Sequence, residues 1–270
     1  MRSIREGTLL CAGIVFLATA ASAEVGRRPL VAANYSNVLA SSANVQGQFG
    51  AYFKTRVTLT NPNLAVLKLD VVAATPSGPL PRARLTLLPG QVLVSDNFLD
   101  ETFQYTGGAA LLFQTRSDNI DPHAPFLLTA EVYAEGASGR FSTYLPVLGA
   151  ADRVASRTDA GASFSPGVVI DGNNRANVGC VNFDATNSVT IAATLVTGSG
   201  THLWNNAFSL QPQQWQQVPV NLAGLPSGST LSFHSLDASM DLYCYAVNVN
   251  NASNDGTQIP AIYVVPSPYY

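Results

Sequence analysis

The sequence is short of charged residues. Only 11% of its 270 residues are Asp, Glu, Lys or Arg, against roughly 25% in an ordinary globular chain. The 14 Lys and Arg are scattered and the formal net charge is −3, which argues against a nucleic-acid binder, because such proteins carry basic patches that neutralise phosphates. A hydrophobic content of 47% is still enough to build a core, which excludes a disordered chain.

Histidine, the commonest acid–base residue of enzymes, is also scarce, with three in the chain. His123 lies in a proline-bounded loop, His202 follows a glycine-rich turn, and His234 lies in a strand pattern. Their spacing matches neither H-x-H nor H-E-x-x-H, so it indicates no metal site. The one serine-containing stretch near a nucleophile motif, Gly161–Ser165, lacks the final glycine of G-x-S-x-G. We therefore predict no catalytic set and no cofactor.

Carboxylates are densest at Asp96, Asp100 and Glu101. Oxygen-rich loops can bind Ca²⁺, and paired carboxylates carry glycoside hydrolysis when about 5–9 Å apart. A solvated loop around a short helical turn explains the same residues, and we favour it because the repeat described below lacks these carboxylates.

The first 23 residues have the pattern of a secretory signal. Arg2 and Arg5 form a basic start, Thr8–Ala20 is apolar, and Ala21-Ser22-Ala23 offers small residues for cleavage. A membrane anchor is the alternative, but the apolar stretch is shorter than the ~20 residues that a spanning helix needs. We expect an exported protein, periplasmic or extracellular, without a transmembrane segment.

Cysteine is rare, and one of the three lies in the predicted signal. The remaining two, Cys180 and Cys244, form an even pair in an oxidising compartment, so we predict a disulfide. Two buried free thiols are the alternative.

What the chain does have is an internal repeat with a period of roughly 120 residues. Matching segments follow in the same order in both copies: Val57–Pro62 with Val178–Phe183, Leu85–Gln91 with Phe208–Gln214, Gly108–Thr115 with Gly228–Ser235, and Tyr144–Pro146 with Gln258–Pro260.

Each copy is a series of short alternating segments separated by turns, as half-buried strands are. We predict an all-β protein with two tandem immunoglobulin-like β-sandwich domains after a cleaved signal peptide. The predicted organisation is a signal peptide (1–23), an extension or first strand (24–39), a first sandwich (40–148), a linker (149–166), a second sandwich (167–265) and a tail (266–270). The linker stretch has room for the first strand of the second sandwich.

The alternation places Cys180 and Cys244 on the inward faces of their strands, where the first copy has Leu59 and Leu128. We expect these strands to lie in opposite sheets, which makes the disulfide an inter-sheet bridge.

The turn and core motifs of the first copy run Thr55 to Asn61-Pro62, Leu85 to Gly90, Gly108 to Phe113, Tyr133, and Gly139 to Pro146. This pattern resembles tandem immunoglobulin-like repeats of exported bacterial proteins over about residues 40–262. The resemblance implies the fold and a surface or periplasmic role, but no assigned activity.

Aromatic residues provide the candidate ligand site. Trp204, Trp215, Tyr243 and Tyr245 lie in the second copy, among amide side chains. Aromatic faces of a sandwich can stack on sugar rings, whereas core packing or cross-strand pairing is the alternative.

Three functions remain. We expect first a non-catalytic binding or adhesion module, whose partner is a protein or a polysaccharide at the cell surface. A structural subunit that assembles by strand pairing, including into a homo-oligomer, is the second, because the apolar segments near both ends could pair with exposed sheet edges. A hydrolase is the third.

Overall fold

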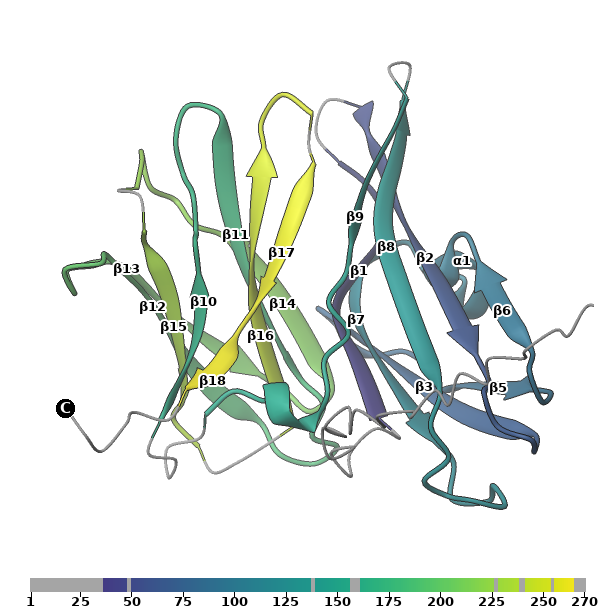
Figure 1. Ribbon diagram of the computed structural model, residues 1–270. Helices are drawn as coiled ribbons and strands as arrows, with labels where there is room; N and C mark the ends of the chain where they lie inside the picture. Colours follow the sequence, from purple (N-terminus) through teal and green to yellow (C-terminus); the bar gives the residue numbers. More distant parts are fainter. Residues whose placement is uncertain are drawn as a thin grey trace, which may run out of the picture. The chain divides into compact units, whose positions relative to one another are not determined.

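The computed structural model describes residues 36–47, 50–136, 139–155, 161–225, 228–237, 241–253 and 255–264. These residues form an all-β protein with two hydrogen-bonded sheets (Figure 1). The predicted signal peptide and the predicted tail lie outside the described residues. In the described part of the chain, no helix is long and apolar enough to cross a membrane.

The described residues of the first half form nine strands and one short helix. They are β1 (Ser36–Gln46), β2 (Tyr52–Thr60), β3 (Leu67–Thr75), β4 (Gly78–Pro79), β5 (Ala83–Leu87), β6 (Val92–Ser95), α1 (Phe98–Phe103), β7 (Gly107–Thr115), β8 (Leu127–Gly136) and β9 (Gly139–Tyr144). The short helical turn predicted around the acidic residues is α1, which contains Asp100 and Glu101.

The first half packs two layers around one core. Strands β5, β3 and β7 form one layer and β6, β2, β8 and β9 form the other. Side chains at alternate positions, such as Leu69 and Val71 on β3, are buried between the two layers. β1 pairs with β7 on both sides of an irregularity between Leu39 and Ser42, and its last residues, Asn44 to Gln46, pair with β2. The backbone hydrogen bonds therefore continue from one layer to the other, so that both layers belong to one sheet. The sequence predicts two separate sheets instead.

In the second half, the residues that the structure describes form nine strands and a short 3-10 helix. They are η2 (Ala150–Asp152), β10 (Ala162–Pro166), β11 (Asn174–Asn182), β12 (Val189–Val196), β13 (His202–Leu210), β14 (Gln214–Pro219), β15 (Thr230–Ser235), β16 (Leu242–Asn250), β17 (Gly256–Pro260) and β18 (Ile262–Val264). Both η2 and β10 fall in the predicted linker, and β10 pairs with β15 and β18 of the second half.

The second half also encloses a core of its own. The sheet β13-β12-β15-β10-β18 packs on the layer β17-β16-β11-β14, and the space between is filled by side chains such as Ile191, Phe208 and Phe233, none of which is exposed.

Strand pairings in the two halves follow the matches found in the sequence. Leu59 on β2 is paired with Leu128 on β8 in the first half, as Cys180 on β11 is with Cys244 on β16 in the second. Two buried asparagines, Asn61 and Asn182, occupy matching turns and each donates from Nδ2 to loop carbonyls.

The disulfide between Cys180 and Cys244 is confirmed, but its predicted inter-sheet position is wrong. The two cysteines are direct partners on neighbouring antiparallel strands of one sheet, with Cα atoms 4.1 Å apart. Alternation fixes the face on which a side chain lies, and both cysteines do lie in the core. It does not say which strands are neighbours, and this is where the expectation failed.

The two halves belong to one compact unit. An apolar cluster joins them, with Val72 and Leu112 from the first half against Phe183, Trp215 and Tyr245 from the second. One parallel residue pair, Gln214 with Thr75, links β14 to β3.

Candidate functional site

A half-open cleft of about 230 Å³ lies where the two halves meet. The first half contributes residues of β1, β8 and β9, and the second half contributes residues of β11, β14, β16 and β17. Strands β9 and β17 lie next to each other at this place (Figure 1). They are the two ends of the same sheet, so each has one edge without a strand partner among the described residues. Most of the cleft lining is apolar, and polar side chains lie between the apolar ones.

Trp215 on β14 lines the cleft and is 7% exposed. Its ring lies over Gly108 on β7, where an added Cβ would come 2.7 Å from the ring. Only glycine leaves room for the indole at this position. Gly179 on β11 has the same relation to Tyr245, whose ring would be 2.4 Å from an added Cβ. Two glycines therefore allow two large aromatic side chains to pack between the halves.

A short chain of hydrogen bonds connects this aromatic pair to the cleft. Trp215 Nε1 donates to the hydroxyl of Tyr245 at 3.1 Å, and that hydroxyl donates to Gln217 Oε1 at 2.8 Å. Burial raises the pKa of Tyr245 well above its ordinary value, because a phenolate would lose its hydration. The hydroxyl therefore stays protonated and fixes the orientation of the Gln217 amide.

Gln258 on β17 is the most unusual polar residue of the cleft. It is 7% exposed, and its Oε1 accepts a hydrogen bond from Ser41 Oγ at 3.3 Å. Its Nε2 is a buried donor with no partner among the described residues. A buried donor without an acceptor costs about 1–3 kcal/mol, so this atom is a place where a ligand oxygen or a water gains a hydrogen bond.

Arg175 on β11 supplies the cation of the cleft. Its Nη1 donates to Asn251 Oδ1 at 2.9 Å. Burial lowers the pKa of the guanidinium below its ordinary value, since the charged form is partly desolvated. An arginine remains charged at neutral pH even so. The carboxylate of Asp255, an exposed residue, lies at the same cleft.

The cleft can hold a ligand by amide, hydroxyl and guanidinium groups over an aromatic floor. The chain's histidines do not line it: His202 is on β13, His234 is on β15, and His123 is in the loop before β8. Ser163, in the stretch with a partial nucleophile motif, is buried, and its Oγ accepts from the backbone N–H of Ala155.

The four predicted aromatic residues do not form one exposed surface. Trp215, Tyr243 and Tyr245 are at most 7% exposed and lie together in the apolar cluster between the halves. Trp204 is half-buried on β13, in the other sheet, against the second core. Of the four, only Trp215 lines the cleft.

The acidic residues near α1 are apart from the cleft. Asp96 forms an ion pair with Arg56 at 2.6 Å, and Glu101 Oε1 accepts from the backbone N–H of Asn97. Asp100 is exposed in the first turn of α1. No group of three or more His, Cys, Asp or Glu residues within the described ranges is arranged to hold a metal ion.

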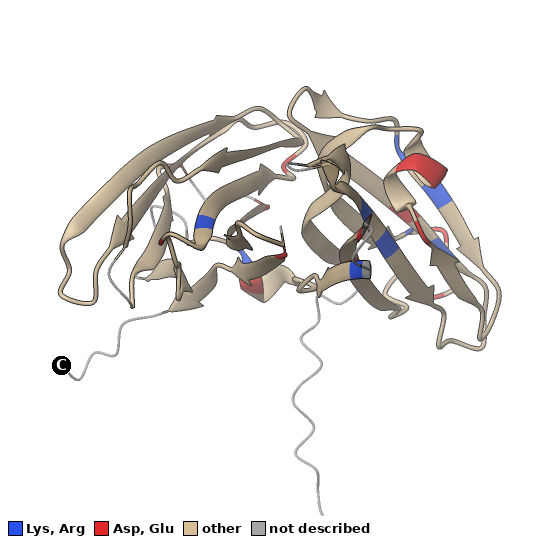
Figure 2. Ribbon diagram, turned by 90° about the horizontal axis from the view of Figure 1, so that it is seen from above, with Lys and Arg blue, Asp and Glu red and all other residues tan. Residues whose placement is uncertain are grey.

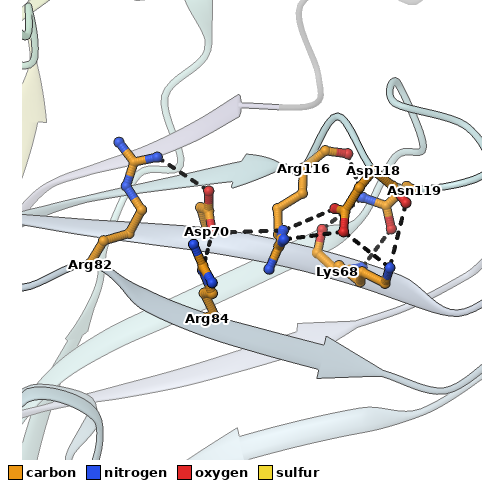
Figure 3. Close-up of polar contacts among 7 residues, drawn as sticks. All are labelled: Lys68, Asp70, Arg82, Arg84, Arg116, Asp118 and Asn119. Carbon is orange, nitrogen blue, oxygen red and sulfur yellow. Dashed lines mark hydrogen bonds and ion pairs between the residues drawn. The ribbon is translucent and has the colours of Figure 1, made fainter.

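A second polar cluster was not visible in the sequence. Lys68, Arg82, Arg84 and Arg116 gather around Asp70 and Asp118 on the β3 layer of the first half (Figure 3). The Asp70 carboxylate is shared by three arginines at 3.2–4.0 Å, and the hydrogen bond from Lys68 lowers the pKa of Asp118. Charged residues are sparse elsewhere on the ribbon (Figure 2).

Sequence reasoning identified Trp215 but missed Gln258, Arg175 and Ser41. No motif marks these three residues, because they meet only when the halves pack together. Comparison with known proteins adds no assignment: no family model, curated protein or solved structure matches the chain.

Proposed function

We propose that the protein is an exported, non-catalytic binding module that holds a cell-surface protein or polysaccharide at the cleft between its halves. The observation that carries the proposal is the half-open cleft, lined from both halves, with the buried, unpartnered Nε2 of Gln258 in its wall. A mostly apolar concave site with a few convergent polar groups is the usual form of a binding site.

Export is supported by two features. The first 23 residues have the composition of a secretory signal, and the Cys180–Cys244 disulfide fits an oxidising compartment. An immunoglobulin-like architecture for each half is part of the same proposal, supported by the two layers around each core and by the pairings that recur in both halves.

Binding is tested with the full chain, secreted with its own N-terminal segment. The purified protein is applied to a glycan array and to immobilised polysaccharides and proteins from bacterial envelopes. We expect saturable retention on at least one of them, reduced by Gly108→Ala, which displaces Trp215 in the cleft. Failure to bind any of these surfaces, or turnover in a hydrolase screen, contradicts the proposal.

A second function, a structural subunit joined by strand pairing, is favoured by one observation. The edge strand β18 exposes Ile262 by 52% and Val264 by 46%, and an exposed apolar edge is a template for another strand. If the second function is right, the mass in solution rises with concentration, and Ile262→Lys restores the monomer. A constant monomer mass excludes it.

A further inference from the structure

We propose that the cleft between the halves holds a single neutral sugar residue of a polysaccharide. This inference rests on the proposed binding function and adds the chemical class of the ligand.

The size limits the ligand to a small unit. A volume of about 230 Å³ is below the ~300–1,000 Å³ of pockets for drug-sized molecules. Because the cleft is open on one side, the rest of a longer ligand can leave toward solvent. One ring of a polymer satisfies both conditions.

The polar groups suit hydroxyls. Gln258 Nε2 is a buried donor without a partner in the described residues, and Ser142 and Thr143 of β9 are among the residues that line the cleft. A sugar hydroxyl both donates and accepts, so it can satisfy an amide and a hydroxyl together. The apolar face of a sugar ring can rest on Trp215 and Phe141, which line the same space.

The charge of the cleft favours a neutral sugar over an acidic one. Arg175 and Asp255 line it together, so one positive and one negative charge are present. Neither sign dominates the site.

The spacing of the strands argues against a peptide that adds as a strand. Neighbouring strands lie about 4.8 Å apart, so an inserted strand needs ~10 Å between its two flanks. The Cα atoms of β9 and β17 come within 8 Å of each other. Their free edges are too close to admit a strand between them.

The chain provides its own fluorescent reporter, since it has two tryptophans and only Trp215 lines the cleft. The variant Trp204→Phe is titrated with glucose, galactose and N-acetylglucosamine, with acetate and alanyl-alanine as contrasts. We expect a saturable change in Trp215 fluorescence with at least one of the sugars and none with the contrasts. In Trp215→Phe, the remaining Trp204 should not respond.

Gln258→Met in the Trp204→Phe background should weaken that binding roughly tenfold, by the loss of one hydrogen bond. Its melting temperature should change little, because the substitution removes an unpartnered buried donor together with the long hydrogen bond that Ser41 donates to Oε1. Gln216→Met on β14 is the matched control, because Gln216 does not line the cleft, and the affinity of this variant should be unchanged.

Unchanged affinity in Gln258→Met overturns the inference, as does a response to acetate or to the dipeptide. If no sugar changes Trp215 fluorescence while the array still shows binding, the inference fails and the proposed function stands. If the array and the envelope surfaces are also negative, both fail.

Discussion

Cys180 and Cys244 face each other across two neighbouring antiparallel strands, β11 and β16, at the position where the first half pairs Leu59 with Leu128. The same core site is thus filled by a covalent pair in one half and by two leucines in the other. Both cysteines are at most 1% exposed. The disulfide is therefore part of the core, where thiols in solution do not reach it while the protein is folded.

The first prediction concerns this disulfide. The double variant Cys180→Ala/Cys244→Ala should lower the free energy of unfolding by roughly 2–5 kcal/mol, because it releases a 64-residue loop in the unfolded chain and leaves space in the core. Urea unfolding with and without reductant measures the loss. The wild type should lose stability when reductant is added, whereas the variant should not; equal responses contradict the prediction.

The sequence predicted the strands, and the face of each strand that is buried, better than it predicted which strands are neighbours in the sheet. Alternation assigned Cys180 and Cys244 to the core, because period two is a local property of the chain. Strand neighbours depend on contacts between distant residues, and the cysteine strands were placed in opposite sheets for that reason.

The cleft could not be predicted from the sequence for a related reason. Ser41 and Gln258, which share a hydrogen bond, are separated by 217 positions and come from different halves. Trp215 drew attention by its residue type alone. Tyr245, a ligand candidate for the same reason, is fully buried, as its alternative of core packing implies. The outward face of a strand in one half is covered by the other half, and no local pattern encodes that packing.

The second prediction concerns the close approach of Trp215 to Gly108. Gly108→Ala should destabilise the protein by about 1–3 kcal/mol, because the new methyl group overlaps the indole ring, which is held in a packed cluster. Thermal unfolding measures the loss. Gly198→Ala is the control, since an added Cβ there meets nothing within 4 Å; a comparable loss in both variants would show that the indole contact is not the cause.

The third prediction concerns the buried turn asparagines. Asn61 Nδ2 donates to the carbonyls of Ala65, Leu87 and Leu88. Asn61→Ala should cost about 1–3 kcal/mol, because it leaves buried carbonyl groups without a donor.

Asn182→Ala should show a loss of the same size, because its Nδ2 donates to Asn187 and Gln211 in the matching turn. The exposed Asn205 on β13 provides the control, and Asn205→Ala should change stability by less than about 0.5 kcal/mol. If Asn205→Ala costs as much as the other two, the turn hydrogen bonds do not explain the effect.

The fourth prediction concerns acid. The pKa of Asp184 is lowered from 3.8, chiefly by hydrogen bonds from the backbone N–H groups of Thr186 and Asn187 to its Oδ1. A carboxylate with a lowered pKa stabilises the fold at neutral pH, and that contribution is lost as the pH falls through the folded-state pKa.

Asp184→Asn keeps an acceptor oxygen without the charge, so it should be less stable than wild type near pH 7 and should approach wild type near pH 3. Asp184→Ala has no acceptor and should stay less stable at both pH values. Urea midpoints at the two pH values decide the matter: a difference between Asp184→Asn and wild type that does not shrink in acid contradicts a stabilising carboxylate at this turn.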